Sequence, residues 1–406
     1  MVLVTYDVDR LRARIPALAD GTAYFDGPGG SQTPDVVAQA IADALTSGLS
    51  NRERTTQAER NADDITLGAR AAGADLVNGD PGGIVFGRSM TELTFQMART
   101  LAQGWGPGDE IVVTRLDHDG NVRPWVNYAE RTGATLRWAE FDPRTGILTA
   151  EDVLRLVNDN TRLVAVTGAS NLLGTRPDTA AIGAGLEQSE ALYYVDGVHL
   201  TAHAAIDMQA IGADFFVCSP YKFLGPHIGM LAASPALLET LHPDKLKPAT
   251  EDVPERFELG TLPYELLAGV TAAIDVLADL VPGDETTMSR RDRLVRSMAA
   301  LEEYEDVLHT RLRSGFESIA GVHLYGHAPL RTPTELFSID GVESPDVYRL
   351  LAERKVNAPA GSFYALEASQ WIGLGSTGAV RAGLAPYTND DDVDRLLDGV
   401  AAIATR

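Results

Sequence analysis

Cysteine is nearly absent from this sequence: Cys218 is the only one in 406 residues. A single thiol excludes an internal disulfide and a cysteine-rich zinc site. Long apolar runs are also missing, and no stretch approaches the length needed to cross a bilayer. The N-terminal segment MVLVTYDVDRLRARIPAL has no long apolar core and no small-residue cleavage site, so no secretory signal is predicted. We therefore expect a cytoplasmic protein.

Basic residues are scarce as well. The chain has 34 Lys and Arg against 57 Asp and Glu, which gives a formal net charge of -23. A field of this sign repels nucleic acids and anionic membranes, so neither is an expected partner. The remaining composition, 45% hydrophobic and 22% charged, is that of an ordinary globular protein. The length is sufficient for one large domain and a smaller one.

The first half of the chain alternates short apolar runs with helical patterns. This alternation predicts the α/β class, with a mostly parallel sheet and crossover helices. The apolar runs are residues 84–86, 110–114, 135–140, 163–167, 191–195 and 214–218, with helical patterns at 90–102, 124–132 and 149–157. A seventh run, residues 228–232, follows Gly225-Pro226, and we expect it to pair at a sheet edge or to bend.

The pattern changes near residue 265, after the segment HPDKLKPATEDVPERF. We predict a large domain at 20–265 and a small α+β domain at 266–406, with residues 1–19 packing on the small domain. The small domain is expected to contain helices at 265–281, 286–315, 345–353 and 390–402, and strands at 322–325 and 336–339.

Lys222 and Asp196 stand just past two consecutive apolar runs. In open α/β sheets the ligand crevice lies outside the carboxyl ends of the strands. An amine in that setting is desolvated and loses basicity, as a Schiff-base lysine must; the alternative is a lysine that reaches solvent. A carboxylate there would keep the ring nitrogen of pyridoxal phosphate (PLP) protonated; the alternative is a turn aspartate before Gly197. Together they predict a PLP site more specifically than either does alone.

The segment Ser89-Met90-Thr91-Glu92 is a capping-box pattern at the start of the helix predicted from residue 90. A helix N-terminus offers free N–H groups and the positive end of a dipole, which suits a phosphate group. The alternative is that the side chains of Ser89 and Glu92 satisfy those donors themselves. Ser219 would add a hydroxyl to the same phosphate.

His118, in Asp117-His118-Asp119, is placed to stack on the cofactor ring and relay protons. The same triplet also suits a metal ion. No further ligand set with sensible spacing accompanies it, so we expect no metal.

These residues occur in segments that resemble the class V aminotransferase family of fold-type-I PLP enzymes, and its cysteine-desulfurase-like branch most of all. The segments are GDEIVVTRLDHDGNVRPW, TRLVAVTGASNLLGT, YYVDGVH, ADFFVCSPYKFLGPHIG and PERFELGT. The resemblance extends from Tyr24 to Gly383. It implies the fold-type-I transferase architecture, with a seven-stranded sheet in the large domain.

The resemblance also implies roles for individual residues around the cofactor. Lys222 would form the Schiff base, Asp196 would pair with the pyridinium nitrogen, and His118 would stack on the ring. His199, where desulfurases usually have glutamine, would approach the phenolic oxygen. The phosphate would be held by residues that approach it from the helix start and the strand end, namely Met90, Thr91, Ser219 and Tyr221, the last at a position where desulfurases usually have histidine.

Two further roles concern the substrate and a second subunit. Asn171 and Arg381 match residues that hold the substrate carboxylate, and arginine suits a bidentate grip on it. Thr261 matches a threonine that reaches the phosphate from a partner subunit. The resemblance therefore implies a homodimer with its sites at the interface.

The departures from the desulfurase pattern bear on the reaction. Tyr364 stands where a desulfurase has its catalytic cysteine, and Pro359 stands where some have a second carboxylate-binding arginine. Cys218 is expected to be buried at a strand end and cannot take over the thiol's role. Persulfide chemistry is therefore disfavoured.

Several readings of function stay open. The favoured one is a PLP enzyme acting on an amino acid or amine by transamination, which needs only Lys222 for the proton shift. Lyase action on a C–S or C–Se bond is the alternative, and epimerisation begins in the same way. A PLP-binding protein without turnover is a third possibility. A nucleotide-binding Rossmann enzyme fits poorly, since the glycines of residues 26–30 precede no close-packed helix.

Overall fold

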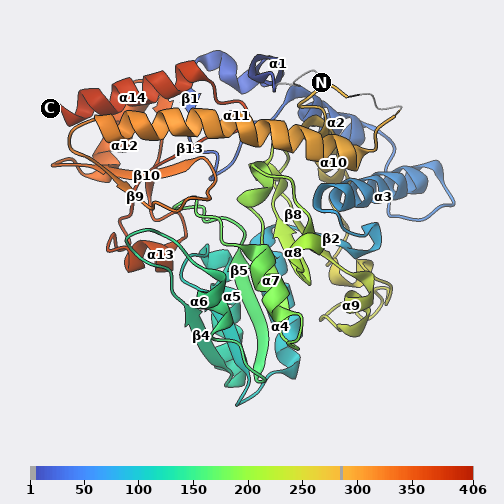
Figure 1. Ribbon diagram of the computed structural model, residues 1–406. Coiled ribbons are helices and arrows are strands. Elements are labelled where there is room, and N and C mark those ends of the chain that lie inside the picture. Colours follow the sequence, from blue (N-terminus) through green and yellow to red (C-terminus); the bar gives the residue numbers. More distant parts are fainter. Residues whose placement is uncertain (1–5, 284–286, 406) are drawn as a thin grey trace.

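The computed structural model describes residues 6–283 and 287–405, and Figure 1 shows their arrangement. A seven-stranded sheet forms the large domain, in the order β2-β8-β7-β6-β5-β3-β4. Its strands are β2 (Ile84–Gly87), β3 (Glu110–Thr114), β4 (Thr135–Ala139), β5 (Thr161–Thr167), β6 (Leu192–Asp196), β7 (Phe215–Cys218) and β8 (Gly229–Ala233). The predicted α/β fold with a mostly parallel sheet is confirmed.

The strands coincide with the apolar runs because parallel strands are covered on both faces, so nearly every side chain is apolar. Among the seven strands of this sheet, β8 is the one whose position was predicted wrongly, since it was expected at a sheet edge or in a bend. It lies inside the sheet and runs antiparallel to both of its neighbours, β2 and β7. The short connection after Lys222 has no room for a crossover helix, so the chain can only turn back beside β7.

Alternate residues of the strands face two helical layers. Val113, Ala165 and Val217 pack with α4 (Met90–Leu101) and α5 (Arg123–Thr132). Val112 and Val166 pack on the other face, where the covering helices include α3 (Gln57–Val77), α7 (Thr179–Leu186), α8 (Met208–Ile211) and α10 (Tyr264–Ala278). The helix expected at 149–157 is shorter, α6 (Ala150–Leu154), with Arg155 as its C-cap.

The small domain is built on an antiparallel sheet in the order β12-β13-β10-β9. Its strands are β9 (Val322–Tyr325), β10 (Thr334–Ile339), β12 (Ala360–Gly361) and β13 (Ala379–Gly383), and its helices are α11 (Arg290–Ser318), α12 (Ser344–Ala352), α13 (Leu366–Trp371) and α14 (Asp390–Ala404). In Figure 1 the long helix α11 runs beside α14 above this sheet. The helix expected from 286 begins at Arg290, capped by Ser289; residue 286 lies outside the described residues.

The start of the chain returns to the C-terminal part of the molecule. Strand β1 (Ala23–Tyr24) pairs in parallel with β11 (Val356–Asn357). The Tyr6 hydroxyl donates a 2.5 Å hydrogen bond to the Pro386 carbonyl, and Arg12 forms a 2.7 Å ion pair with Asp392. The remaining helices are α1 (Val8–Arg12), α2 (Asp35–Thr46) and α9 (Pro235–Thr240). Across the described ranges, every helix is too short or too polar to traverse a bilayer.

Candidate active site

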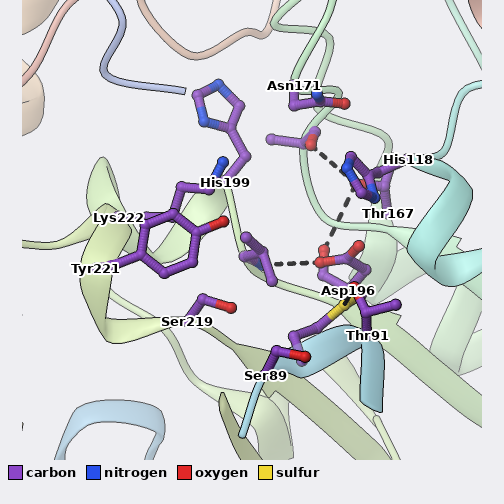
Figure 2. Close-up of a pocket in the computed structure, with 13 residues that line it drawn as sticks. Ser89, Thr91, His118, Thr167, Asn171, Asp196, His199, Ser219, Tyr221 and Lys222 are labelled. Carbon is purple, nitrogen blue, oxygen red and sulfur yellow. Dashed lines mark hydrogen bonds between the residues drawn. The ribbon is translucent and has the colours of Figure 1, made fainter. Parts of the chain in front are cut away.

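The carboxyl ends of β5, β6 and β7 and the start of α4 surround a pocket. Figure 2 shows Lys222, Tyr221 and Ser219 on one side of it and His118 and Asp196 on the other. The predicted site residues that line it are Met90, Thr91, His118, Asn171, Asp196, His199, Ser219, Tyr221 and Lys222. Thr261 and Arg381 are not among the lining residues. The lining also includes residues that were not predicted as site residues, namely Ser89, Thr167, Ala169 and Val198.

Lys222 follows β7 in a single 3-10 turn, Pro220–Lys222, and its side chain is buried. The ammonium donates a hydrogen bond to the Pro28 carbonyl. Burial, aided by the positive charge of Arg381, lowers the pKa of Lys222 to about 7. A substantial fraction of this amine is therefore neutral near neutral pH, as a nucleophilic lysine requires.

Asp196 is the last residue of β6, next to β7 in the sheet, so its carboxylate faces the pocket that Lys222 lines. One carboxylate oxygen accepts a 2.9 Å hydrogen bond from the Val198 amide. Burial raises the pKa of Asp196 to about 6, while the Val198 amide and the Lys222 charge oppose that rise. The side chain is thus mostly ionised at pH 7 and offers a negative charge in a dry setting.

Asp117 is a second buried carboxyl beside this pair, and sequence reasoning did not assign it a role. It accepts hydrogen bonds from the Thr114 hydroxyl and, at 2.7 Å, from the Asn121 amide. Burial, together with the charge of Asp196, raises the pKa of Asp117 to about 8, while the hydrogen bonds from Thr114 and Asn121 oppose that rise. Asp117 therefore holds a proton at pH 7, which leaves Asp196 as the ionised member. Its place directly before His118 was the available signal.

His118 presents a neutral ring to the pocket. Burial, with the charges of Lys222 and Arg381, lowers the pKa of His118 to about 3. Its Nδ1 accepts a 2.9 Å hydrogen bond from the Gly120 amide, so the ring proton resides on Nε2. The ring lies 5.7 Å from that of Tyr364, tilted by 38°. A neutral aromatic ring of this kind can cover a flat ligand and accept or return a proton.

The start of α4 carries the predicted phosphate seat, but its capping box is only half formed. The Ser89 hydroxyl accepts a 3.1 Å bond from the Glu92 amide, as expected. The Glu92 carboxylate instead accepts from the Arg88 amide at 2.9 Å. The amides of Met90 and Thr91 precede the first intrahelical hydrogen bond, so they are available to an anion.

Strand β8 supports this helix start through Gly229. A Cβ atom there would lie 2.2 Å from the Ser89 carbonyl carbon and 2.5 Å from the Met90 nitrogen. Only glycine lets the strand and the helix N-terminus approach so closely. The position of the predicted phosphate seat therefore depends on β8.

His199 and Tyr221 also line the pocket, and the side chain of each contacts a neighbouring side chain. His199 Nε2 lies 2.8 Å from the Thr332 hydroxyl and 3.2 Å from that of Thr334, both in the small domain. Burial holds the pKa of His199 well below its usual value, so the ring is neutral. The Tyr221 ring stacks on His227 at 4.8 Å and 5°. Their predicted contacts with a cofactor stay predictions.

Asn171 and Arg381, the predicted carboxylate grip, lie together but are engaged within the protein. Arg381 donates a 3.0 Å hydrogen bond to the main-chain carbonyl oxygen of Asn171 and forms an ion pair with Asp26 at 2.5 Å. Its guanidinium carbon lies 3.7 Å from the centre of the Phe363 ring. The side-chain amide of Asn171 donates a 2.9 Å hydrogen bond to the Phe363 carbonyl oxygen. The sequence did not indicate Asp26 or Phe363 as partners of this grip.

Three other predicted positions do not line the pocket. Thr261 is exposed and lines a neighbouring cavity, which shares Ser89 with the pocket. Tyr364 is 77% exposed. Cys218 is fully buried on β7, and burial raises the pKa of its thiol, so it is unsuited to sulfur transfer. In residues 6–283 and 287–405 no group of three or more potential ligands is arranged for a metal ion.

The donor set around this pocket fits PLP. The start of α4 and Ser219 suit a phosphate, Lys222 supplies a weakly basic amine, and Asp196 supplies a buried carboxylate. One further atom points to a missing partner: within the described part of the chain, the buried Oδ1 of Asn171 has no hydrogen-bond donor.

The sequence and the fold are similar to those of known proteins. The sequence model of the family described as Aminotransferase class-V matches residues 23–396. An uncharacterized protein of Mycobacterium tuberculosis is 34% identical over 404 residues, covering 98% of this chain and 100% of that protein. An aminotransferase-like protein of Gibberella zeae is 30% identical, covering 97% of each chain. The crystal structure of the cysteine desulfurase CsdA from Escherichia coli superposes with a TM-score of 0.86 at 27% identity, covering 98% of both chains.

Proposed function

The chain belongs to the class V aminotransferase family, and from this membership and the pocket we propose that it binds PLP through Lys222 and acts on the amino group of an amino acid. One observation carries the proposal: Lys222 and Asp196 leave neighbouring strands and line one pocket, with pKa values moved toward each other by burial. Strong shifts of this kind in one cleft are typical of catalytic groups.

Bound PLP would supply an aldehyde that condenses with amines and a ring that accepts electrons from the substrate's α-carbon. The residues of the chain would do the rest. Lys222 would hold the cofactor and move a proton at the α-carbon. Asp196 would keep a proton on the ring nitrogen. Met90 and Thr91 would donate their amides to the phosphate, and His118 would cover the ring.

Among the reactions open to such a site we favour transamination, because Lys222 alone suffices for its proton shift. Persulfide chemistry lacks a thiol, since Tyr364 occupies the expected place and Cys218 is buried. Cleavage of a C–S or C–Se bond without persulfide formation is the second candidate, supported by the similarity to a cysteine desulfurase. The third candidate is a PLP-binding protein without turnover. It would be yellow when purified, and no amino acid would change its absorbance spectrum.

We further propose a homodimer in which Thr261 serves the site of the partner subunit. Two features support it. Thr261 is exposed and, in its own subunit, lines a neighbouring cavity rather than the pocket itself. That cavity also contains Leu259, which is 52% exposed and would be covered by a second copy.

The variant Lys222→Ala tests the assignment of the cofactor. We expect the yellow absorbance of the purified protein to disappear in Lys222→Ala and to persist in Lys247→Ala, an exposed lysine, as the control. Unchanged colour in Lys222→Ala would refute the role of this lysine. Incubation of the wild-type protein with a panel of amino acids then identifies the reaction. A keto acid with pyridoxamine phosphate indicates transamination, whereas pyruvate or alanine with sulfide or selenide indicates a lyase.

A further inference from the structure

A single 3-10 turn after β6, Leu200–Ala202, has His199 as its N-cap and His203 as its C-cap. The His203 amide closes this turn with a 2.9 Å hydrogen bond to the Leu200 carbonyl. The turn brings the two imidazole rings together edge-on, with their centres 5.0 Å apart and their planes at 78°. His199 lines the pocket (Figure 2), whereas the buried His203 does not. His203 therefore contacts a pocket residue without lining the pocket itself.

His203 also contacts Glu305, which belongs to helix α11 of the small domain. The Nδ1 atom of His203 lies 2.8 Å from a carboxylate oxygen of Glu305, and the two side chains are only 3% and 2% exposed. Burial raises the pKa of Glu305, His203 opposes that rise, and the charges of Glu302 and Asp306 on the same helix add to it. The pair thus joins a helix of the small domain to a turn of the large domain.

Stability alone is a poor explanation for this pair. Within the described part of the chain, Nε2 of His203 and Oε1 of Glu305 are buried without a hydrogen-bond partner. An unpaired buried atom costs free energy, and apolar side chains often stabilise a core as well as a buried ion pair does. Helix α11 carries a second buried pair that is better satisfied: Glu335 lies 2.7 Å from His309 and also pairs with Arg313 at 3.0 Å.

The small domain holds His199 at one nitrogen atom. Its Nε2 lies 2.8 Å from the Thr332 hydroxyl and 3.2 Å from that of Thr334. An imidazole that is held at one atom can still tilt, so these hydroxyls do not by themselves fix the edge that the ring presents to the pocket. The ring of His203, packed against that of His199, restricts this tilt.

We propose that Glu305 and His203 are positioning residues for His199. Glu305 holds His203 by a hydrogen bond, and the His203 ring keeps that of His199 in the orientation in which it donates to the phenolic oxygen of PLP. This inference rests on the proposed function and on the predicted place of His199 beside that oxygen. A donor there stabilises the negative charge of the oxygen and lowers its basicity. The small domain thus acts on the cofactor through two buried side chains that do not line the pocket.

The pH at which the yellow absorbance of the holoprotein changes reports on this donor. The phenolic oxygen and the Schiff-base nitrogen share one proton, and a less basic oxygen releases it at lower pH. We expect His203→Ala to raise the midpoint of this change by about half a pH unit or more. His309→Ala is the matched control, because it removes the histidine of the other buried pair on α11, and His309 does not line the pocket. Equal midpoints in the two variants would overturn the inference.

Two substitutions of Glu305 test the hydrogen bond and leave every pocket-lining residue in place. Glu305→Ala removes the anchor of His203, whereas Glu305→Gln keeps its length and an oxygen that accepts from Nδ1. We expect the midpoint to rise in Glu305→Ala and to stay close to that of the wild-type protein in Glu305→Gln. A midpoint that is displaced equally in both would contradict positioning through this bond. The comparison stands even if His203→Ala does not fold.

NMR of the histidine rings in the apoprotein gives a readout that needs no PLP. The signal of His199 is identified by its absence in His199→Gln. We expect this signal to move in Glu305→Ala and to keep its place in His309→Ala. Yellow protein in which neither the signal nor the midpoint moves in Glu305→Ala sinks the positioning role alone. Protein that never binds PLP sinks the proposed function instead, which keeps the two failures distinct.

Discussion

Burial acts in opposite directions on the two central residues of the pocket. It penalises the charged form of each, so the pKa of Lys222 falls to about 7 and that of Asp196 rises to about 6. The pKa of the neighbouring Asp117 is raised more strongly, to about 8, so this side chain carries a proton at pH 7. The result is an amine that is largely neutral and a single ionised carboxylate, which is the charge state that PLP binding needs.

The pKa of Lys222 leads to a prediction about the uptake of PLP by the apoprotein. Only the neutral amine attacks the aldehyde, and below the pKa its fraction falls about tenfold per pH unit. We expect the uptake rate to rise with pH through a midpoint near 7 and then level off. Stopped-flow absorbance between pH 5.5 and 9 measures this, with a free lysine derivative as reference. A rate that keeps rising past pH 9, as the reference does, would contradict the lowered pKa.

Asp196→Asn removes the negative charge beside the proposed ring nitrogen but keeps the size of the side chain. We expect the protein to stay yellow while solvent exchange of an amino acid's α-hydrogen slows by about 100-fold or more, since the ring would lose its proton. Proton NMR in heavy water follows this exchange. Asp214→Asn is the control, because Asp214 is a partly buried acid that accepts from the Tyr193 amide before β7, at the opposite end of that strand. Equal rates in the two variants would remove Asp196 from the mechanism.

At the scale of elements, strand β8 and helix α4 together form the support of the proposed phosphate seat. Gly229→Ala would place a methyl group 2.2 Å from Ser89, and the helix start must move to admit it. We expect PLP affinity to fall about tenfold or more and the protein to lose about 1–3 kcal/mol of stability. A PLP titration and a urea melt measure the two effects. Gly48→Ala is the control, since a Cβ there meets nothing within 4 Å; wild-type PLP affinity in Gly229→Ala would contradict the supporting role of β8.

The elements that the sequence predicted well are those fixed by local pattern. Most of the buried strands are continuous apolar runs, and Lys222 and Asp196 were found because each follows such a run. Asn171, His199 and Tyr221 were assigned through the family resemblance instead. The position of β8 was missed because strand order depends on the length of the connection before it rather than on the strand's own residues. The contact between Phe363 and Asn171 was missed because nothing in the sequence marks a left-handed backbone at Phe363 and Tyr364.

Contacts between distant parts of the chain were beyond sequence reasoning for the same reason. Asp26 and Arg381 form an ion pair across 355 positions, and nothing in the sequence connects the two residues. His203 and Glu305 form a buried 2.8 Å pair between a loop of the large domain and helix α11. His203 in turn meets the ring of His199 edge-on at 5.0 Å. Pairings of this kind depend on how two domains dock, which no local pattern records.

At the scale of the whole molecule, the site draws on both domains. The large sheet supplies Lys222 and Asp196. The small domain supplies Thr332, which contacts His199, and Phe363, which contacts Asn171. Residues from Asp26 to Arg381 therefore take part in or support one pocket. The match of the family along residues 23–396 is understandable on this basis, because a shorter stretch would not contain the site.

The proposed homodimer leads to a prediction that two impaired variants restore each other. If Thr261 reaches the phosphate of the partner, a mixed dimer of Lys222→Ala and Thr261→Ala has one damaged site and one site with both residues intact. We expect Thr261→Ala alone to bind PLP more weakly and Lys222→Ala alone to form no yellow adduct. Co-expression with two different tags, followed by purification on both, isolates the mixed dimer, and a PLP titration then counts its tight sites. One tight site per dimer supports service across the interface. If Thr261 serves its own subunit, the site that keeps Lys222 lacks Thr261, and the mixed dimer binds PLP no more tightly than Thr261→Ala does.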